Sequence, residues 1–142
     1  MATFTAVHEL GKYLGDATID FDTHTFKGVI TNTTPAQATN ALLGDLTQIA
    51  ATGGYAAVTL TGVTYGETGS GTGIWEFDSA PFSWTASGAD FATGRYIYIY
   101  DDTATGDPLV GYVDYGATFV LTDGNTLTVT PGANGILRLT VT

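Results

Sequence analysis

The chain has 142 residues, with 14 Asp and Glu against 4 Lys and Arg, and it contains no cysteine. Its formal charge of −10 repels phosphate backbones and anionic lipid, so nucleic acid and membranes are not expected partners. The lack of cysteine excludes disulfides, thiolate metal sites and thiol nucleophiles. Abundant Thr and Gly with few strong helix formers indicate a β protein, of a length that suits one domain over 1–142.

The first 22 residues are expected to form a helical or arm-like segment. Val7, Leu10 and Leu14 recur at three- and four-residue spacing, with Thr5 as N-cap and Gly15 beyond the end. No apolar run is long enough for a membrane-spanning helix, and the charged-then-apolar layout of a signal peptide is absent. We therefore expect synthesis in a cytoplasm.

The middle of the chain alternates strand and turn patterns. A second short helical segment is predicted at 41–49. The glycine-rich stretch 65–73 is expected to be a mobile loop, or a loop ordered only by contact, and is the best candidate for an interaction arm. Ile74–Asp78 and Phe82–Ala86 are predicted as a pair of strands that carry both tryptophans, Trp75 and Trp84, into the core. Earlier strands are predicted at 24–32 and 55–63.

The clearest pattern is a hairpin over 94–115. Tyr and Ile alternate along 95–100, the chain turns through the acidic residues 101–107, and a second apolar run follows. Three more short strands are expected near 119–121, 127–129 and 136–141. About eight short antiparallel strands with a short N-terminal helix predict an all-β fold, a two-sheet sandwich of jelly-roll or Greek-key type.

Patterns that would carry chemistry are weak. His8 and His24 lack neighbours at metal-ligand spacing, so no metal or cofactor is expected. The turn that holds Asp101, Asp102 and Asp107 suits either a hard cation or ordinary side-chain bonds to backbone amides, and we favour the latter. Two carboxylate pairs resemble those of glycosidases but are more simply solvent-facing: Glu76 with Asp78, and Asp20 with Asp22.

Tyrosines on the predicted hairpin are candidates for an exposed aromatic face. Tyr96, Tyr98 and Tyr100 project from one side of their strand, and Tyr112 and Tyr115 lie on the returning strand. Such a row suits a subunit interface or a carbohydrate platform, and equally an ordinary sheet face. The sequence pattern leaves these alternatives open.

A wider resemblance emerges from RYIYIYDDTATGDPLVGYVDYGATFVLTDGNTLTVTPGANGILRLTV. This run resembles the C-terminal half of a family of small virion proteins of tailed bacteriophages, with an aromatic strand, a D/N-D-T turn, a D-P-L-[IV]-G-[YW]-x-D-[YF]-G return and a D-G-x-[TF]-x-V strand. The stretch HTFKGVITNTTPAQATNALLGDLTQIA is similar to the K-[VL]-x-L-T-N-T-x-P start of the same family. The resemblance spans nearly the whole chain.

The resemblance implies a non-enzymatic capsid decoration, or cement, protein that binds the major capsid protein on the outside of the shell, often as a homotrimer, and so a virion location. Contact with the capsid is then expected from the N-terminal segment and the glycine-rich loop, at Ala2, Thr3, Phe4, Thr5, His8, Tyr65, Glu67 and Ser70. A subunit interface is expected at Tyr96, Tyr98 and Tyr112. The alternative is a tail or fibre-tip protein that recognises host glycan, and a hydrolase that uses Glu76 and Asp78 is a third hypothesis.

Overall fold

The structure, a computed structural model, describes residues 3–141 and is mainly β. Its elements are β1 (Phe4–Ala6), α1 (Leu10–Gly15), β2 (Phe26–Thr31), η1 (Leu43–Asp45), β3 (Val58–Thr59), β4 (Thr64–Glu67), β5 (Ile74–Asp78), β6 (Phe82–Thr85), β7 (Gly94–Asp101), β8 (Leu109–Phe119), β9 (Thr126–Val129) and β10 (Leu137–Thr140). All strand pairs are antiparallel, which confirms the predicted all-β class. No helix within residues 3–141 is long and apolar enough to cross a membrane.

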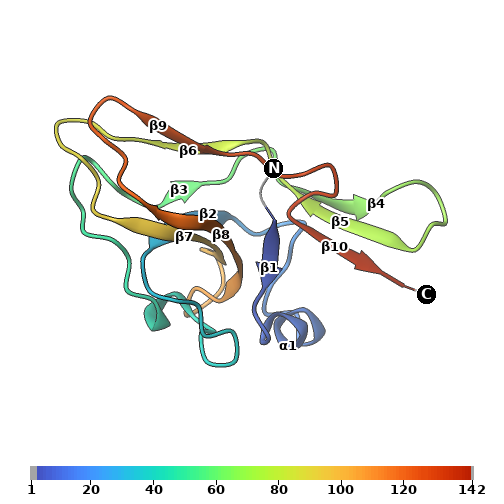
Figure 1. The fold of residues 1–142 in the computed structure, drawn as a ribbon. Coiled ribbons are helices and arrows are strands. Elements are labelled where there is room, and N and C mark those ends of the chain that lie inside the picture. The colour runs from blue at the N-terminus through green and yellow to red at the C-terminus, as the bar shows by residue number, and fades with distance from the viewer. Residues whose placement is uncertain (1–2, 142) are drawn as a thin grey trace.

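The strands form three sheets. A five-stranded sheet has the order β1-β8-β7-β2-β3, a three-stranded sheet has the order β10-β5-β4, and β6 pairs with β9 in a two-stranded ribbon. Figure 1 shows the ribbon on one side of the large sheet, α1 on the other side, and the three-stranded sheet beside β1. The predicted hairpin is confirmed as β7 and β8, but β5 and β6, expected as a pair, belong to different sheets.

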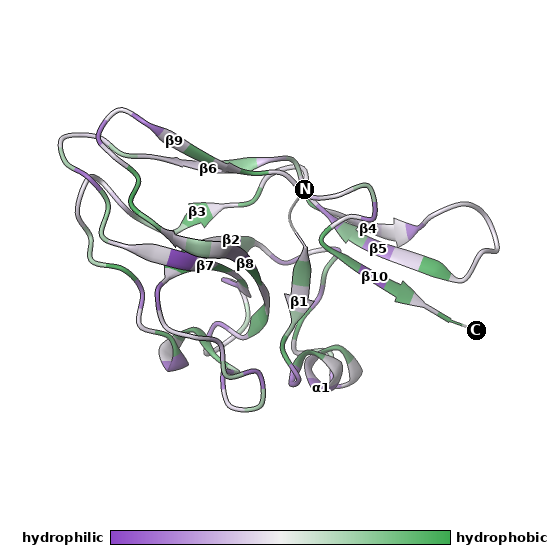
Figure 2. Ribbon diagram, in the orientation of Figure 1, coloured by the Kyte–Doolittle hydropathy of each residue, from purple (hydrophilic) through white to green (hydrophobic). Residues whose placement is uncertain are grey.

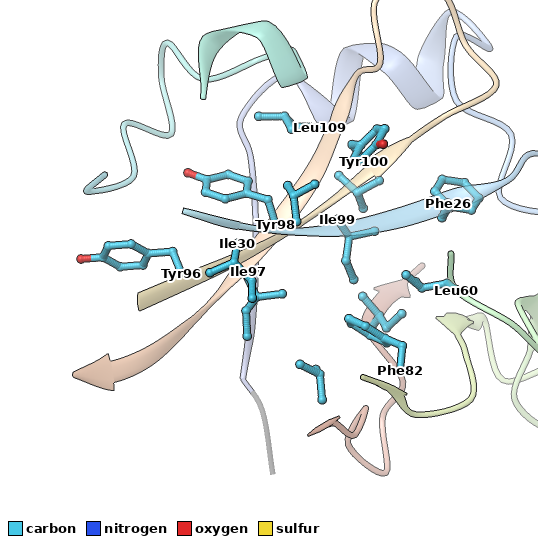
Figure 3. Close-up of a cluster of buried hydrophobic side chains, with 14 of the residues drawn as sticks. Phe26, Ile30, Leu60, Phe82, Tyr96, Ile97, Tyr98, Ile99, Tyr100 and Leu109 are labelled. Carbon is cyan, nitrogen blue, oxygen red and sulfur yellow. The ribbon is translucent and has the colours of Figure 1, made fainter. Parts of the chain in front are cut away.

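Both faces of β7 are buried, which explains why its tyrosines alternate with isoleucines and not with polar residues. Ile97 and Ile99 face the same side as Gly28 of β2, and a side-chain carbon at Gly28 would lie 3.0 Å from the ring of Phe82. The absence of a side chain at Gly28 therefore lets the β6–β9 ribbon pack closely on the large sheet. Figure 3 shows the isoleucines and Phe82 in this cluster and the tyrosines on the opposite face.

Three local expectations are corrected. The start of the predicted N-terminal helix is instead β1, which pairs with residues 111–113 of β8, and α1 spans only six residues. The predicted strand 55–63 is reduced to the two residues of β3, and the expected helical turn at 41–49 is the 3-10 turn η1. Residues 4–6 form a strand because they pair with β8, and the short helix predicted from the local pattern would be only marginally stable without packing.

The two tryptophans, both expected in the core, have different environments. Trp84 is 3% exposed, and its Nε1 donates to the carbonyl of Ala56 at 2.9 Å. Trp75 is 39% exposed, so the prediction is wrong for this residue. Phe77, two residues along β5 on the same face, is fully buried against Phe21, so the core ends between these two positions.

Candidate contact surface

The expected capsid-contact residues fall at two places along β10. Thr3 and Phe4 border a groove of about 290 Å³ together with Arg138, near the beginning of β10. The 68–73 loop lies at its other end, where the amide of Val141 donates to the carbonyl of Gly73. Four strand residues separate these ends by about 13 Å, so the two segments do not form one continuous patch.

The N-terminal segment is a sheet edge. Thr5 pairs with Tyr112, and both Phe4 and Thr5 are half-buried, while Thr3 and His8 are exposed. Ala2 lies outside the described residues. Because the amide and carbonyl groups on the outer edge of β1 have no strand partner in the described sheet, this edge offers backbone hydrogen bonds as well as side chains.

The glycine-rich loop is tied down by one of its predicted contact residues. Glu67 accepts hydrogen bonds from the amides of Gly73, at 2.8 Å, and Gly71, at 3.1 Å. These amides lower the pKa of Glu67. The amide of Thr68 also donates to the carbonyl of Ile74, at 2.8 Å. The expected mobile loop is therefore a closed β-turn structure over 68–73, with Ser70 exposed at its tip.

Tyr65 is not part of that loop. It lies in β4, half-buried, with its ring 5.4 Å from that of Phe21 and 5.7 Å from that of Trp75. The pairing of Tyr65 with Phe77 gives this strand a core-facing side that glycine content alone did not indicate. The predicted loop thus begins three residues too early.

The tyrosines expected at a subunit interface are largely covered by the chain itself. Tyr96 is 6% exposed and Tyr98 is fully buried, so their rings offer almost no area to a partner. Burial raises the pKa of Tyr98 to about 12. Tyr112 is half-buried, its ring lies 5.2 Å from that of Tyr98, and its hydroxyl accepts from Gln37. Gln37 and Asn40, which bond the hydroxyls of Tyr112 and Tyr98, come from an irregular segment in which no pattern predicted this role.

The acidic turn between β7 and β8 is built from internal hydrogen bonds. Asp101 is fully buried, and one of its oxygens accepts from the amides of Thr103 and Ala104. Its other oxygen lies 2.6 Å from Nδ1 of His24. Asp102 pairs with Lys27 at 2.7 Å. The two amide bonds to Asp101 are the side-chain to backbone bonding that was favoured for this turn, whereas His24 and Lys27 contribute side-chain partners. Within residues 3–141 no group of three acidic, His or Cys side chains is placed to hold a metal.

The carboxylate pairs considered for glycoside hydrolysis are engaged in structural contacts. Glu76 is paired with Arg138, and the carboxylate of Asp78 accepts from the amide of Ser79. Asp20 accepts from the hydroxyl of Thr23 and the amide of Asp22. Each contact has a local structural role in a strand pair or a turn.

All four Lys and Arg side chains lie within ion-pair distance of a carboxylate. The pairs are Lys12 with Asp16, Lys27 with Asp102, Arg95 with Asp114, and Arg138 with Glu76. Side-chain hydrogen bonds from Arg95 lower the pKa of Asp114. The remaining acidic residues carry the net charge of −10, so the protein presents a negative surface without free basic side chains to balance it.

Comparison of the chain with models of protein families, with curated proteins and with solved structures gives no match.

Proposed function

We propose that this chain is a non-enzymatic virion structural protein of a tailed bacteriophage, a capsid decoration protein that binds the outer surface of the major capsid protein shell and stabilises the head. The observation that carries the proposal is the resemblance of the hairpin sequence to that phage family. The motif DPLVGYVDYG supplies most of β8, and the aromatic strand before it is β7, at the centre of the largest sheet.

The fold part of the proposal is a two-layer sandwich. The large sheet supplies one layer and the β6–β9 ribbon the other, in the jelly-roll or Greek-key manner that the series of short antiparallel strands predicts. Close packing of Phe82 on Gly28 supports this arrangement. The short helix α1 then closes the opposite face beside β8.

The electrostatic part of the proposal is a basic receiving surface on the shell. Because every Lys and Arg is already paired within the chain, a partner gains attraction by offering its own cations. Attachment of many copies, expected as homotrimers, would then strengthen the head through multivalency.

The experiment is reconstitution on heads of the encoding phage that lack the protein. The purified chain is mixed with such heads, and cryo-electron microscopy counts the copies and locates them. We expect regular density over the three-fold positions of the shell. Density on tails alone, or none on heads, would contradict the proposal.

A matched pair of substitutions tests the loop contact. Ser70→Arg places a bulky cation at the exposed tip of the 68–73 loop, and Thr105→Arg makes the same change at the exposed tip of the β7–β8 turn. Both variants should melt like the parent chain because neither site is buried. Occupancy on heads should fall for Ser70→Arg alone. Equal occupancy for both would remove the loop from the contact.

The second candidate function is host-glycan recognition by a tail or fibre-tip protein. The exposed ring of Trp75 beside Tyr65 favours it, because aromatic rings at a surface suit sugar faces. Copy number separates the two candidates: a shell protein is present in many symmetry-related copies and a tail-tip protein in few. Quantitative mass spectrometry of purified virions makes this distinction without any variant.

A further inference from the structure

A groove separates the end of α1 and the loop after it from the three-stranded sheet. Its volume is about 430 Å³, within the range of small-molecule sites. One wall holds Leu14, Ile19 and Asp20, the other holds Tyr65 and Leu139, and His24 also lines it. In Figure 1 these walls correspond to α1 with the segment that follows it and to the β10-β5-β4 sheet.

Two neighbouring rings on the sheet side form an aromatic platform: Tyr65 lines the groove, and Trp75 lies beside Tyr65. Tyr65 pairs with Phe77 and Glu67 with Trp75, so Tyr65 and Trp75 project from the same face. Their ring centroids are 5.7 Å apart and their ring planes are inclined by 32°, so the two rings are direct neighbours on this face. Hydrophobic and hydrophilic residues alternate along β10 (Figure 2). Leu139 of β10 pairs with Trp75, so its side chain projects from the same face of the sheet as Trp75.

The platform is held in place from beneath. The ring of Phe21 lies 5.4 Å from that of Tyr65 and is stacked on Phe77 at 4.2 Å. Phe77 is fully buried, whereas Trp75 is 39% exposed. Because Phe21 and Phe77 already hold the platform in place, the platform loses little conformational entropy when a ligand packs against its exposed edge.

Hydrogen-bonding groups stand across from the platform. The buried carboxylate of Asp101 engages Nδ1 of His24 at 2.6 Å and so orients the imidazole. The side chain of His24 is 22% exposed in the groove, which makes Nε2 the nitrogen offered to a ligand. Asp20 adds carboxylate oxygens that are positioned by Thr23 and by the amide of Asp22.

We propose that this groove binds a neutral saccharide. A pyranose presents an apolar C–H face to the Tyr65–Trp75 platform and hydroxyls to the His24 and Asp20 side, so both walls find complementary groups. The Asp20 carboxylate and the net charge of −10 disfavour anionic sugars and phosphates. A cationic ammonium ligand fits less well, because rings inclined by 32° form a platform and not an enclosing cage.

This inference goes beyond the capsid-decoration proposal, because the site belongs to the single chain and does not depend on attachment to a shell. It deepens the second candidate, host-glycan recognition, by naming the site and the class of sugar. The test accordingly uses the isolated protein, and failure of shell binding would leave its outcome unchanged. The two tryptophans make the measurement internally controlled. Trp84 is buried with its Nε1–H bonded to Ala56, whereas Trp75 is partly exposed beside Tyr65, which lines the groove.

The experiment follows both indole Nε1–H signals by ¹H–¹⁵N NMR during titration with glucose, galactose, mannose, N-acetylglucosamine and their short oligomers. We expect at least one probe to shift the Trp75 signal saturably, with a Kd of about 1 mM, while the Trp84 signal stays fixed. No shift of the Trp75 signal by any probe at about 50 mM would overturn the proposal, because that is well above such a Kd.

Two variants localise the binding. Binding by each variant is followed by the backbone amide signal of Leu139, which lines the groove and is present in both. Trp75→Ala should weaken binding by about tenfold or more through loss of its aromatic ring. Tyr115→Ala removes an aromatic ring that is 55% exposed on β8, outside the groove, and should leave binding unchanged. An unmoved Trp84 signal in Trp75→Ala shows that the fold is retained. Equal binding by both variants would refute the assignment.

Two further results would also refute it. A stronger response of the Trp75 signal to choline than to any sugar would make the site a cation cage. A shift of that signal with protein concentration alone would show that a second copy of the chain covers the platform.

Discussion

The buried Asp101 carboxylate provides the sharpest test of how this fold is held together. It accepts from Nδ1 of His24 at 2.6 Å and from the amides of Thr103, at 2.9 Å, and Ala104, at 3.1 Å. The bond to His24 fastens the β7–β8 turn to the loop before β2, and the two amide bonds close the turn itself. Asp101→Ala removes all three at once and leaves a small void at a fully buried position.

The expected loss follows from the individual bonds. A hydrogen bond to a charged group is worth about 1.5–3 kcal/mol, and one between neutral groups about 0.5–1.5 kcal/mol. The amides of Thr103 and Ala104 are only partly buried, so water partly replaces the lost acceptor there and the bond to His24 contributes most of the loss. We therefore expect Asp101→Ala to lower the free energy of unfolding by about 3 kcal/mol. At roughly 3 °C per kcal/mol for a chain of this size, Tm should fall by about 10 °C.

Asp101→Asn separates the charge from the shape. An asparagine oxygen still accepts from the two amides, and its NH₂ group can donate to Nδ1 if His24 adopts the other tautomer. The cost should therefore be only about 1 kcal/mol, the difference between charged and neutral bonds. Nitrogen NMR should place the proton of His24 on Nδ1 in the parent chain and on Nε2 in the variant.

Urea and thermal denaturation, followed by circular dichroism, measure these differences. Asp22→Ala is the control, because its carboxylate is exposed in the same loop as His24 and its loss should change stability by no more than about 0.5 kcal/mol. If Asp101→Ala costs no more than this control, the anchoring role assigned to Asp101 is wrong.

Two further predictions concern pH. Burial raises the pKa of Tyr55 to about 12, so its neutral form stabilises the fold fully below the unfolded value near 10, and that stability is lost as pH rises towards 12. Tyr55→Phe should flatten the fall in urea midpoint above pH 10, and an unchanged slope would exclude this group as its source. The amides of Gly73 and Gly71 lower the pKa of Glu67, so the loop contacts should persist above the ordinary Glu pKa and be lost as pH falls through the lowered one. Glu67→Gln should therefore speed amide exchange at Gly73 near neutral pH, and equal exchange in both chains would count against the loop structure described above.

The β7–β8 hairpin could be predicted because its alternation reflects a real difference between two buried faces. Ile97 and Tyr98 point to opposite faces of the sheet and both are buried. The alternation of Ile and Tyr therefore reveals the strand although no polar residue marks a solvent-facing side. The acidic turn could be predicted for a different reason, because Asp and Gly favour turns through local side-chain and backbone chemistry. These features depend on residues close together in the chain.

The groove was not predictable, because its walls come from segments far apart in sequence. Trp75 and Phe77 share a strand face, and nothing in their spacing tells which one Phe21 covers. His24 looked isolated because its partner, Asp101, lies 77 residues away. β1 was mistaken for the start of a helix because its pairing with β8 is invisible to local periodicity.

The pairing order of the sheets also governs how the chain folds. Among the main pairs, β2 joins β7, β1 joins β8, β5 joins β10 and β6 joins β9, and each pair closes a long loop. The chain loses the entropy of closing each loop before the contacts between the paired strands form. Folding should therefore be slow compared with helical proteins of similar size. The early strands β1, β2, β5 and β6 then remain with unpaired edges until the late strands form. Charged side chains within them, Lys27 in β2 and Glu76 and Asp78 in β5, discourage association with other chains during this interval.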